Sequence, residues 1–217
     1  MMLTVWSSSI IKLFDQIVKL VCYNFDMKEN TRQKLIDATF DEIYSNGYQG
    51  AALADILACA GVHKGSMYHF FANKKEMALS AIQEKIAERF GTRYRSIAES
   101  DGEYLESFFR GLRDLNQRDF KRGCPVANIV QEMSNIDEDF NSLMKAIYAA
   151  FRLGIKTIYD RAIEAGELCP CDTDKLALFT TVALEGAILA AKASGEPQDY
   201  IDSVEMLIGY IESYRHG

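Results

Sequence analysis

The feature that most constrains the fold is a pair of short helical patterns between residues 52 and 75, separated by a three-residue break. The apolar positions of the first pattern are Leu53, Ile56 and Leu57. In the break, Gly61 can adopt the positive φ that other residues resist, and Val62 can fill the space between the two helices. Two short helices joined by a turn that contains glycine form a helix-turn-helix, whose second helix enters the major groove of DNA. The stretch therefore predicts a DNA-binding module.

The second short pattern carries groups that suit DNA. Lysine ammonium groups bind phosphates, and hydroxyl, phenol and imidazole groups can hydrogen-bond to sugars or base edges. Gly65 has no side chain, so the backbone can approach the groove closely, and the backbone N–H of Ala52 can bind a phosphate. We expect DNA contacts from Ala52, His63, Lys64, Gly65, Ser66, Tyr68, His69 and Lys74. An ordinary helical hairpin would explain the apolar positions but not this polar cluster.

These residues resemble the DNA-binding motif of the TetR family of bacterial transcriptional regulators. The matched positions are Ala60-Gly61-Val62-x-Lys64-Gly65-Ser66-x-Tyr68-His69-x-Phe71, with Lys74 after them and with Gly47-Tyr48 and Asp55-Ile56 before them. Family members usually have Thr or Ser where Ala51 and Ala52 stand, and alanine cannot supply the helix cap or the phosphate contact. The resemblance implies a cytoplasmic, homodimeric repressor that a small apolar ligand or a reactive electrophile releases from a near-palindromic DNA operator.

Composition and periodicity predict an all-α protein. Of the 217 residues, 48% are hydrophobic, 25% are charged and only three are proline, as in ordinary soluble globular proteins. Helical spacing predicts further helices over residues 30–46, 74–100, 103–120, 126–133, 137–165 and 176–191 and from residue 198 onward. We therefore divide the chain into an N-terminal extension (1–27), a helix-turn-helix DNA-binding domain (28–75) and an all-helical ligand-binding and dimerisation domain (76–217).

Charge is distributed unevenly between these domains. Residues 28–75 carry six Lys/Arg and five Asp/Glu, a balance of +1, whereas residues 76–217 carry 16 and 24, a balance of −8. The total of −7 argues against a protein that nucleic acid coats on all sides. Because the acidic domain would repel DNA, we expect only the helix-turn-helix domain to face the duplex.

Residues 1–26 contain an amphipathic helical pattern whose function is open. Its apolar positions are Ile10, Leu13, Phe14, Ile17, Leu20 and Val21. The segment is too short and too charged to span a membrane, and it lacks the basic start of a signal peptide. It is an extra helix, a surface anchor or sequence upstream of the true start, because Met27 opens a segment that resembles the beginning of family members. We favour the first and third readings over a membrane role.

Residues 176–191 form the most apolar helical pattern of the chain. They include one charge, Glu185, and no polar face, so protein must cover the helix on both sides. We expect the helix to be too short and too polar for a bilayer. The simplest cover is a second copy of the chain, because a two-fold dimer also supplies two recognition helices. The resemblance implies the same homodimer, through residues 172–194 and 198–215, in which we expect Leu184 and Ile188 at the interface. The alternative is a monomer whose last helix covers the second side.

The third domain contains more large apolar side chains than packing alone requires. The resemblance implies a pocket for a small-molecule inducer between its helices, where bundles place ligand sites. We expect ligand contacts from Phe108, Phe109, Met133, Met144, Tyr148, Phe151, Phe179 and Glu185. Each apolar member could instead be an ordinary core residue. Glu185 is either a ligand anchor or half of an ion pair, because a carboxylate on an apolar helix needs a partner.

One cysteine stands at a place that favours reactivity. Cys124 starts a predicted helix and follows Lys121 and Arg122, so positive charge and the helix dipole should lower the pKa of its thiol. Gly-Cys at this place resembles a TetR subgroup, some of whose members respond to oxidants or electrophiles. We therefore name Cys124, with Lys192 as a nearby amine, as a candidate redox sensor; the alternative is a buried, inert cysteine. We expect Cys59 to be a small packing residue.

The sequence offers no catalytic, cofactor or metal site. It shows no nucleophile–base pair, phosphate loop or matched set of Cys and His, and Cys169-Pro170-Cys171 is only half of a zinc site. These observations argue against an enzyme. The remaining alternative to a DNA-binding regulator is a helical module that binds only proteins.

Overall fold

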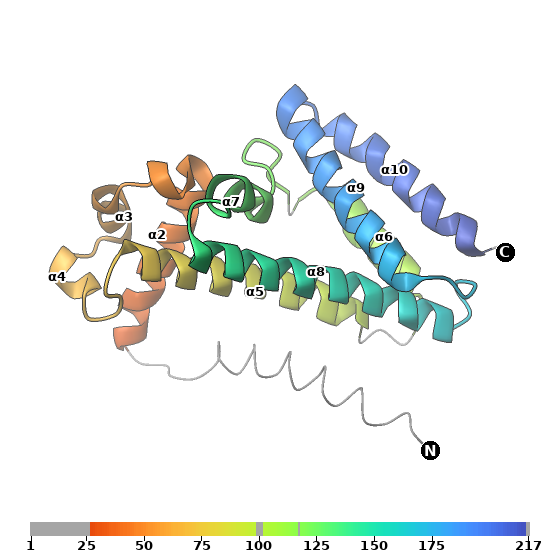
Figure 1. Cartoon of the computed structure of the whole chain (residues 1–217), viewed down its shortest axis with the longest axis horizontal. Helices are drawn as coiled ribbons and strands as arrows, with labels where there is room; N and C mark the ends of the chain where they lie inside the picture. The colour runs from red at the N-terminus through yellow and green to blue at the C-terminus, as the bar shows by residue number, and fades with distance from the viewer. Residues whose placement is uncertain (1–26, 99–101, 117, 216–217) are drawn as a thin grey trace, which may run out of the picture. The chain divides into compact units, whose positions relative to one another are not determined.

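The computed structural model describes residues 27–98, 102–116 and 118–215, and within them all regular structure is helical (Figure 1). The helices are α2 (Met27–Gly50), α3 (Leu53–Ala60), α4 (Lys64–Met67), α5 (Lys74–Ala98), α6 (Tyr104–Arg113), α7 (Pro125–Met133), α8 (Glu138–Glu164), α9 (Thr173–Ser194) and α10 (Pro197–Glu212), followed by the 3-10 turn η1 (Ser213–Arg215). The predicted all-α class is confirmed, whereas the amphipathic pattern of residues 1–26 lies outside the described residues. The chain forms two compact units that divide between Gly91 and Thr92.

In the first unit, α2 packs against α3 and the first part of α5. The apolar side chains that α2 buries include Leu35, Ile36, Phe40 and Ile43. The Arg32 guanidinium donates to the Glu84 carboxylate of α5, with Nη1 and Oε2 3.0 Å apart. The Arg89 guanidinium of α5 lies 5.0 Å from the centre of the Phe40 ring. These contacts explain why the compact unit extends along α5 to residue 91.

A kink at Gly47 interrupts α2, where φ is 76° and ψ is 167°. The sequence predicted that the helix ends at Asn46-Gly47, and the kink confirms that the regular helix stops there. The physical reason is that glycine adopts positive φ without the steric cost that other residues meet. At the other end, α2 begins at Met27 rather than at the predicted residue 30.

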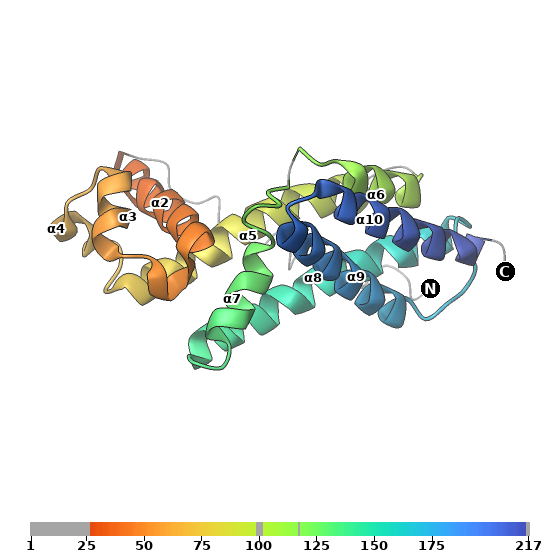
Figure 2. The same cartoon turned by 90° about the horizontal axis from the view of Figure 1, so that it is seen from above.

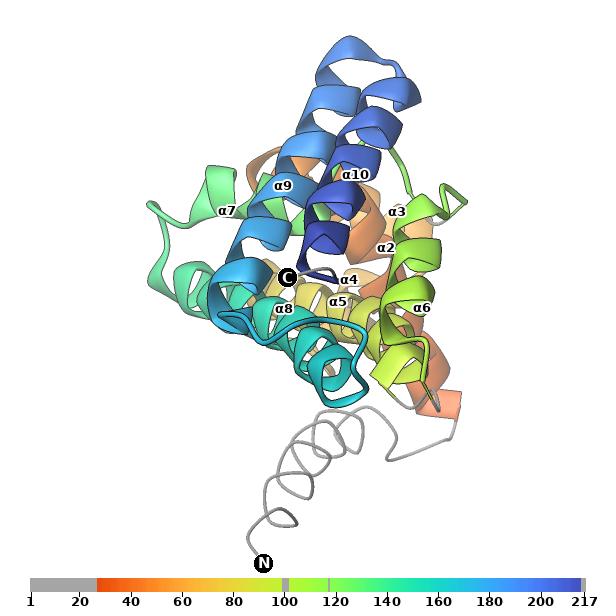
Figure 3. The same ribbon diagram turned by 90° about the vertical axis from the view of Figure 1, so that its right-hand side faces the viewer.

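In the second unit, α9 packs along α10 and against α8 (Figures 2 and 3). The buried hydroxyl oxygens of Tyr159 on α8 and Thr180 on α9 are 2.7 Å apart and share a hydrogen bond. The Tyr200 hydroxyl of α10 donates to the carbonyl oxygen of Leu112 on α6, at 2.9 Å. These buried hydrogen bonds fix the register of the helices, because breaking one would leave a polar group unpaired in the core.

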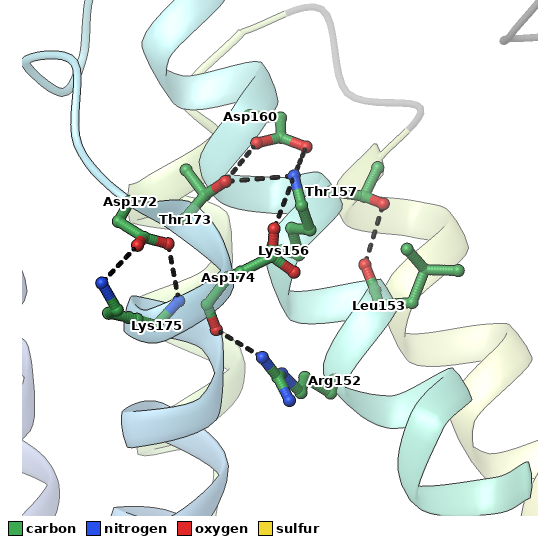
Figure 4. Close-up of polar contacts among 9 residues, drawn as sticks. All are labelled: Arg152, Leu153, Lys156, Thr157, Asp160, Asp172, Thr173, Asp174 and Lys175. Atoms are coloured by element: carbon green, nitrogen blue, oxygen red, sulfur yellow. Dashed lines mark hydrogen bonds and ion pairs between the residues drawn. The ribbon is translucent and has the colours of Figure 1, made fainter.

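A polar network joins the C-terminal half of α8 to the start of α9 (Figure 4). The Lys156 ammonium donates to the Asp160 carboxylate at 2.7 Å and to the Thr173 hydroxyl at 3.1 Å, and that hydroxyl donates to Asp160 at 2.6 Å. The Asp172 side chain accepts from the backbone N–H of Lys175 at 3.0 Å. The sequence offers Asp172 or Thr173 as the cap of this helix, and the bond shows that Asp172 is the cap.

Helix α6 is shorter than predicted. It ends at Arg113, whereas helical spacing predicted a helix to residue 120. Asp114 adopts an extended conformation, and its side chain accepts from the backbone N–H of Asn116 at 3.0 Å. Such a local turn competes with the helix for the same backbone groups. The loop that follows is held by Arg118, whose guanidinium lies 4.5 Å from the centre of the Tyr200 ring.

Among the described residues, α9 is the one helix long and apolar enough to cross a membrane by length and composition, with a mean hydropathy of 1.6 over an 18-residue window. The expectation that it is too short and too polar to do so is therefore corrected. A helix in the core of a soluble protein meets the same criteria, and α9 packs against α8 and α10. Composition alone is thus weak evidence for a membrane span.

Candidate functional site

The turn between α3 and α4 has the geometry that the sequence predicted. Gly61 is left-handed, with φ 64° and ψ 34°, and its N–H donates to the carbonyl of Ala58 at 3.1 Å. The N–H of Val62 donates to the carbonyl of Leu57 at 3.0 Å. These two hydrogen bonds end α3 in the manner of a glycine C-cap and turn the chain into the second helix. Met67 of α4 is fully buried, so it packs this helix against the rest of the first unit.

The predicted DNA-contact residues are open to solvent, with two partly covered members. The exposed ones are Ala52, His63, Lys64, Gly65, Tyr68 and His69, and the partly covered ones are Ser66 and Lys74. A Cβ atom added at Gly65 would meet nothing within 4 Å, so the backbone there is freely accessible. Ala52 stands at the N-cap of α3 and makes no side-chain cap hydrogen bond, as its identity requires.

Lys74 makes contacts that the sequence did not reveal. Its Nζ atom donates to the carbonyl oxygen of Tyr48 at 2.6 Å and lies 4.5 Å from the centre of the Tyr48 ring. The lysine therefore ties the start of α5 to the end of α2, just beyond the Gly47 kink. The sequence did not reveal the contact between Lys74 and Tyr48, because the two residues stand 26 positions apart.

Cys59 is exposed on α3, so the expectation that it packs inside the DNA-binding module is wrong. The buried positions of α3 are Ile56, Leu57 and Ala60. They form one face of the helix, and Cys59 stands outside that face.

The residues predicted to contact a ligand fall into three groups. Phe108, Phe109, Met133 and Met144 are buried, and Tyr148, Phe151 and Glu185 are partly buried. Phe179 is 47% exposed, and its ring centre lies 5.0 Å from that of Tyr210 on α10. The structure therefore does not place Phe179 among internal side chains. Because α9 is apolar on all of its faces, the sequence pattern did not show that the Phe179 side chain points outward.

The Cys124 thiol and the Glu185 carboxyl are brought together from α7 and α9. The Sγ atom of Cys124, at the N-cap of α7, donates to Oε1 of Glu185 at 3.2 Å. The other carboxyl oxygen, Oε2, is buried and has no hydrogen-bond partner among the described residues. Burial raises the pKa of Glu185, against the opposing effect of the hydrogen bond from Cys124.

The predicted activation of Cys124 is wrong. Burial, and secondly the negative charge of Glu185, raises the pKa of the Cys124 thiol to about 12. The neighbouring cations act elsewhere: Nε of Arg122 pairs with the Asp119 carboxylate at 2.6 Å, and Lys121 is exposed. Sequence proximity overstated their influence, because the carboxylate that reaches the thiol is 61 residues away.

The Lys192 side chain packs over Gly123, the residue that precedes Cys124. A Cβ atom added at Gly123 would stand 2.8 Å from Cδ of Lys192, and φ at Gly123 is +83°. The Lys192 ammonium donates to the side-chain oxygen of Asn128 on α7 at 3.3 Å. Glycine before Cys124 thus allows the lysine chain to cross the start of α7. Asn128 was not predicted, and no local pattern in the sequence marks it.

An apolar surface, which we call the α9–α10 face, is open to solvent. Its members are Leu178, Phe179, Val182 and Leu189 on α9 and Met206 and Tyr210 on α10, with exposed fractions between 44% and 77%. Leu184 is 5% exposed and belongs to the core of its own subunit, so its predicted place at an interface is corrected. Contiguous exposed side chains of this kind mark an interaction site.

Comparisons with known proteins agree with this architecture. Residues 35–81 match the family model described as bacterial regulatory proteins, tetR family, and residues 103–207 match the model described as tetracyclin repressor-like, C-terminal domain. The crystal structure of a TetR-family transcriptional regulator from Cytophaga hutchinsonii superposes with a TM-score of 0.79 at 23% identity, covering 89% of this chain and 99% of that chain.

Two relatives are similar in sequence. The transcriptional regulator AcuR of Cereibacter sphaeroides is 31% identical over 172 residues, which cover 76% of this chain and 78% of the relative. The HTH-type transcriptional repressor NemR of Escherichia coli is 23% identical over 154 residues, which cover 69% of this chain and 75% of the relative. The chain therefore belongs to the TetR family of bacterial DNA-binding transcriptional regulators, a family of regulators and not of enzymes.

Proposed function

We propose that the protein is a repressor that binds a near-palindromic operator as a homodimer and leaves it when a small molecule binds the second unit. Relatives such as NemR carry the name of transcriptional repressor. The observation that carries the proposal is the coexistence of an accessible helix-turn-helix with the exposed α9–α10 face. The helix-turn-helix would contact DNA, and the α9–α10 face would hold two protomers together.

The α9–α10 face supports a homodimer through residues 172–194 and 198–215. Six large apolar side chains exposed on two neighbouring helices are costly in water, and a second copy of the same face would bury them. A two-fold pair of α4 helices spaced by about 34–36 Å would match one turn of DNA. A second protomer on this face would also explain why the outer surface of α9 is apolar, so that no lipid bilayer is needed to cover it.

The proposed roles of the DNA-binding residues follow from their chemistry and exposure. Lys64 and Ser66 read base edges, whereas Tyr68 and Lys74 bind phosphates or sugars. The Lys74 ammonium already bonds to the Tyr48 carbonyl, so its contribution to DNA binding includes holding α2 and α5 together. We assign the DNA-binding role to residues 28–75 and the ligand-binding and dimerisation role to residues 76–217.

The proposed ligand site lies between α6, α7, α8 and α9. The buried Phe108, Met133 and Met144 supply apolar surface, and Tyr148 and Glu185 supply polar groups beside it. Bundles commonly hold ligands among such side chains. Phe179 is not part of this site, because its side chain is exposed and packs against Tyr210.

A binding experiment with the full chain tests the proposal. DNA upstream of the protein's own coding region is titrated and followed by fluorescence anisotropy, with scrambled DNA of equal length as the control. We expect tight binding to a near-palindrome with two protomers per site, at least about 10³-fold tighter than to scrambled DNA. Equal affinity for both DNAs would contradict recognition of an operator in this region.

A second candidate function is covalent sensing at Cys124, with the chain in the TetR subgroup that carries the Gly-Cys motif. The closeness of Lys192 to Gly123 favours it. The raised pKa of the thiol opposes it, because the thiolate is the reactive form. Operator affinity of the wild type and of Cys124→Ser, before and after a quinone or mild oxidant, separates the two. A response in the wild type alone would establish sensing, and an identical response in both proteins would exclude it.

A further inference from the structure

Three acidic groups from three helices meet around Glu185. Cys124 comes from the start of α7, Tyr148 from α8 and Glu185 from α9. The thiol and the carboxyl are hydrogen-bonded, and the phenol is close enough for its ionisation to be affected by both. Burial, and secondly the charges of Glu185 and Cys124, raises the pKa of the Tyr148 phenol. A negative charge on Glu185 therefore disfavours ionisation of both the thiol and the phenol.

Among the described residues, no Lys, Arg or His donates a hydrogen bond to Glu185, whose carboxyl accepts only from Cys124. Burial raises the pKa of Glu185, and the hydrogen bond from Cys124 lowers it. The Lys192 side chain packs over Gly123, and its ammonium donates to the side-chain oxygen of Asn128 rather than to Glu185. Meanwhile Oε2 of Glu185 is buried and unpartnered. A buried carboxyl oxygen without a partner is unusual and calls for a group that the chain itself does not supply.

We propose that the inducer is a small organic cation, a protonated amine or a quaternary ammonium with an apolar part, whose positive charge sits at Oε2 of Glu185 beside the Tyr148 ring. This inference rests on the proposed function as a ligand-released repressor and names the chemistry of its ligand.

The chemistry of the cluster favours a cation over a neutral or anionic group. A buried carboxylate is stable only with a positive partner, which an ammonium group provides. The face of a tyrosine ring attracts the same charge. Residues 76–217 carry a net charge of −8, so the field of the whole domain draws cations and repels anions.

Binding of a cation should be coupled to release of the proton that Glu185 holds. The folded protein without ligand holds a proton on Glu185 to a higher pH than an exposed carboxyl does. A cation stabilises the ionised carboxylate, so it binds more tightly as pH rises and releases the proton as it binds below the raised pKa. Burial raises the pKa values of the Cys124 thiol and the Tyr148 phenol further above neutral pH, so Glu185 is the member of the cluster that titrates in this range.

The test uses three probes that share one ring and differ in charge: benzylammonium, benzyl alcohol and benzoate. Binding to the full-length dimer is measured by isothermal titration calorimetry, in two buffers of different ionisation enthalpy to count protons. We expect benzylammonium to bind at least about tenfold more tightly than benzyl alcohol, with proton release, and benzoate not to bind. Preference for benzyl alcohol or benzoate, or no binding of any probe at millimolar concentration, would overturn the proposal.

Two variants localise the effect. Glu185→Gln keeps the shape of the side chain and should remove the preference for the cation, whereas Glu196→Gln, at an exposed carboxyl between α9 and α10, should keep it. Tyr148→Leu retains the carboxylate and should weaken benzylammonium binding several-fold. If Glu185→Gln retains the full preference in a protein of unchanged melting temperature, the site is not at Glu185.

Operator binding without ligand is measured separately on the same proteins. Loss of operator binding in the wild type would refute the proposed function. Intact operator binding with no preference for the cation would refute only this inference.

Discussion

The Cδ atom of Lys192 lies 2.8 Å from the point where a Cβ atom on Gly123 would stand. Gly123 also has φ of +83°, a conformation that side-chain-bearing residues rarely adopt. Two independent features therefore favour glycine immediately before Cys124. One arises from the backbone and the other from a side chain 69 positions away on α9.

Gly123→Ala should lower the free energy of unfolding by on the order of 1–3 kcal/mol, because it combines backbone strain with a clash. Urea unfolding followed by circular dichroism measures the loss. Gly111→Ala is the matched control: a Cβ atom there meets nothing within 4 Å, so a neutral effect or a gain of about 0.5–1 kcal/mol is expected. Adding Lys192→Ala to Gly123→Ala should restore only the part due to the clash. Equal losses at Gly123 and Gly111 would contradict this account.

The α9–α10 face predicts which substitutions separate the protomers without unfolding them. Val182→Glu changes a side chain that is 61% exposed, so the helix should remain folded while the dimer dissociates and operator affinity falls by at least about 100-fold. Sedimentation velocity and anisotropy measure the two effects. Leu184→Glu should instead unfold the subunit, because Leu184 is buried in its own core.

The control for that experiment is Leu153→Glu on α8, where the side chain is 38% exposed but outside the α9–α10 face. It should leave both the dimer and operator binding intact. A Val182→Glu protein that remains dimeric, or a Leu153→Glu protein that dissociates, would show that the dimer interface is not the α9–α10 face.

The polar side chains in and directly after α4 predict two kinds of DNA-binding defect. Tyr68→Phe should weaken binding to operator and random DNA by a similar factor, since phosphate contacts carry no sequence information. Lys64→Ala and Ser66→Ala should change operator preference, at a cost of about 1–3 kcal/mol on the original site. Anisotropy titrations on operator, single-base variants and random DNA distinguish these cases. Lys145→Ala, exposed on α8, is the control. Uniform losses for all variants on every DNA would refute the division of roles.

Lys74→Ala should differ from the other DNA-binding variants because Lys74 also bonds to the Tyr48 carbonyl. We expect lower stability of the first unit, by about 1–2 kcal/mol, together with weaker DNA binding. A thermal melt of the variant measures the first effect. Unchanged stability would mean that the contact with Tyr48 contributes nothing.

The sequence was most informative where function and backbone conformation depend on local residues. The turn at Gly61 and the break at Gly47 each follow from the conformational freedom of glycine, and both are confirmed. A cap at Asp172 or Thr173 was predicted, and the structure selects Asp172. The apolar pattern of α9 likewise predicted a helix that needs protein on two sides.

Sequence reasoning failed where a residue's surroundings come from distant parts of the chain. Lys121 and Arg122 are neighbours of Cys124 in sequence, but Glu185 and burial determine the pKa of its thiol. Phe179 could not be assigned to an inner or outer face, because a helix that is apolar all round carries no periodic signal.

The last prediction concerns the pH dependence of stability, and it follows from the raised pKa of Glu185. Between the ordinary carboxyl pKa of about 4.5 and the raised value, the folded protein holds a proton that the unfolded chain has lost. The free energy of unfolding contributed by this group therefore falls as pH rises through that window, and it stays low above it. Glu185→Gln carries no titratable group, so the variant should gain stability relative to the wild type as pH is raised from 5 to 8. Urea unfolding at these two pH values measures the difference, with Glu196→Gln as the control that shows no such trend. A gap between wild type and Glu185→Gln that is constant with pH, or that shrinks as pH rises, would show that the carboxyl does not hold its proton in the fold.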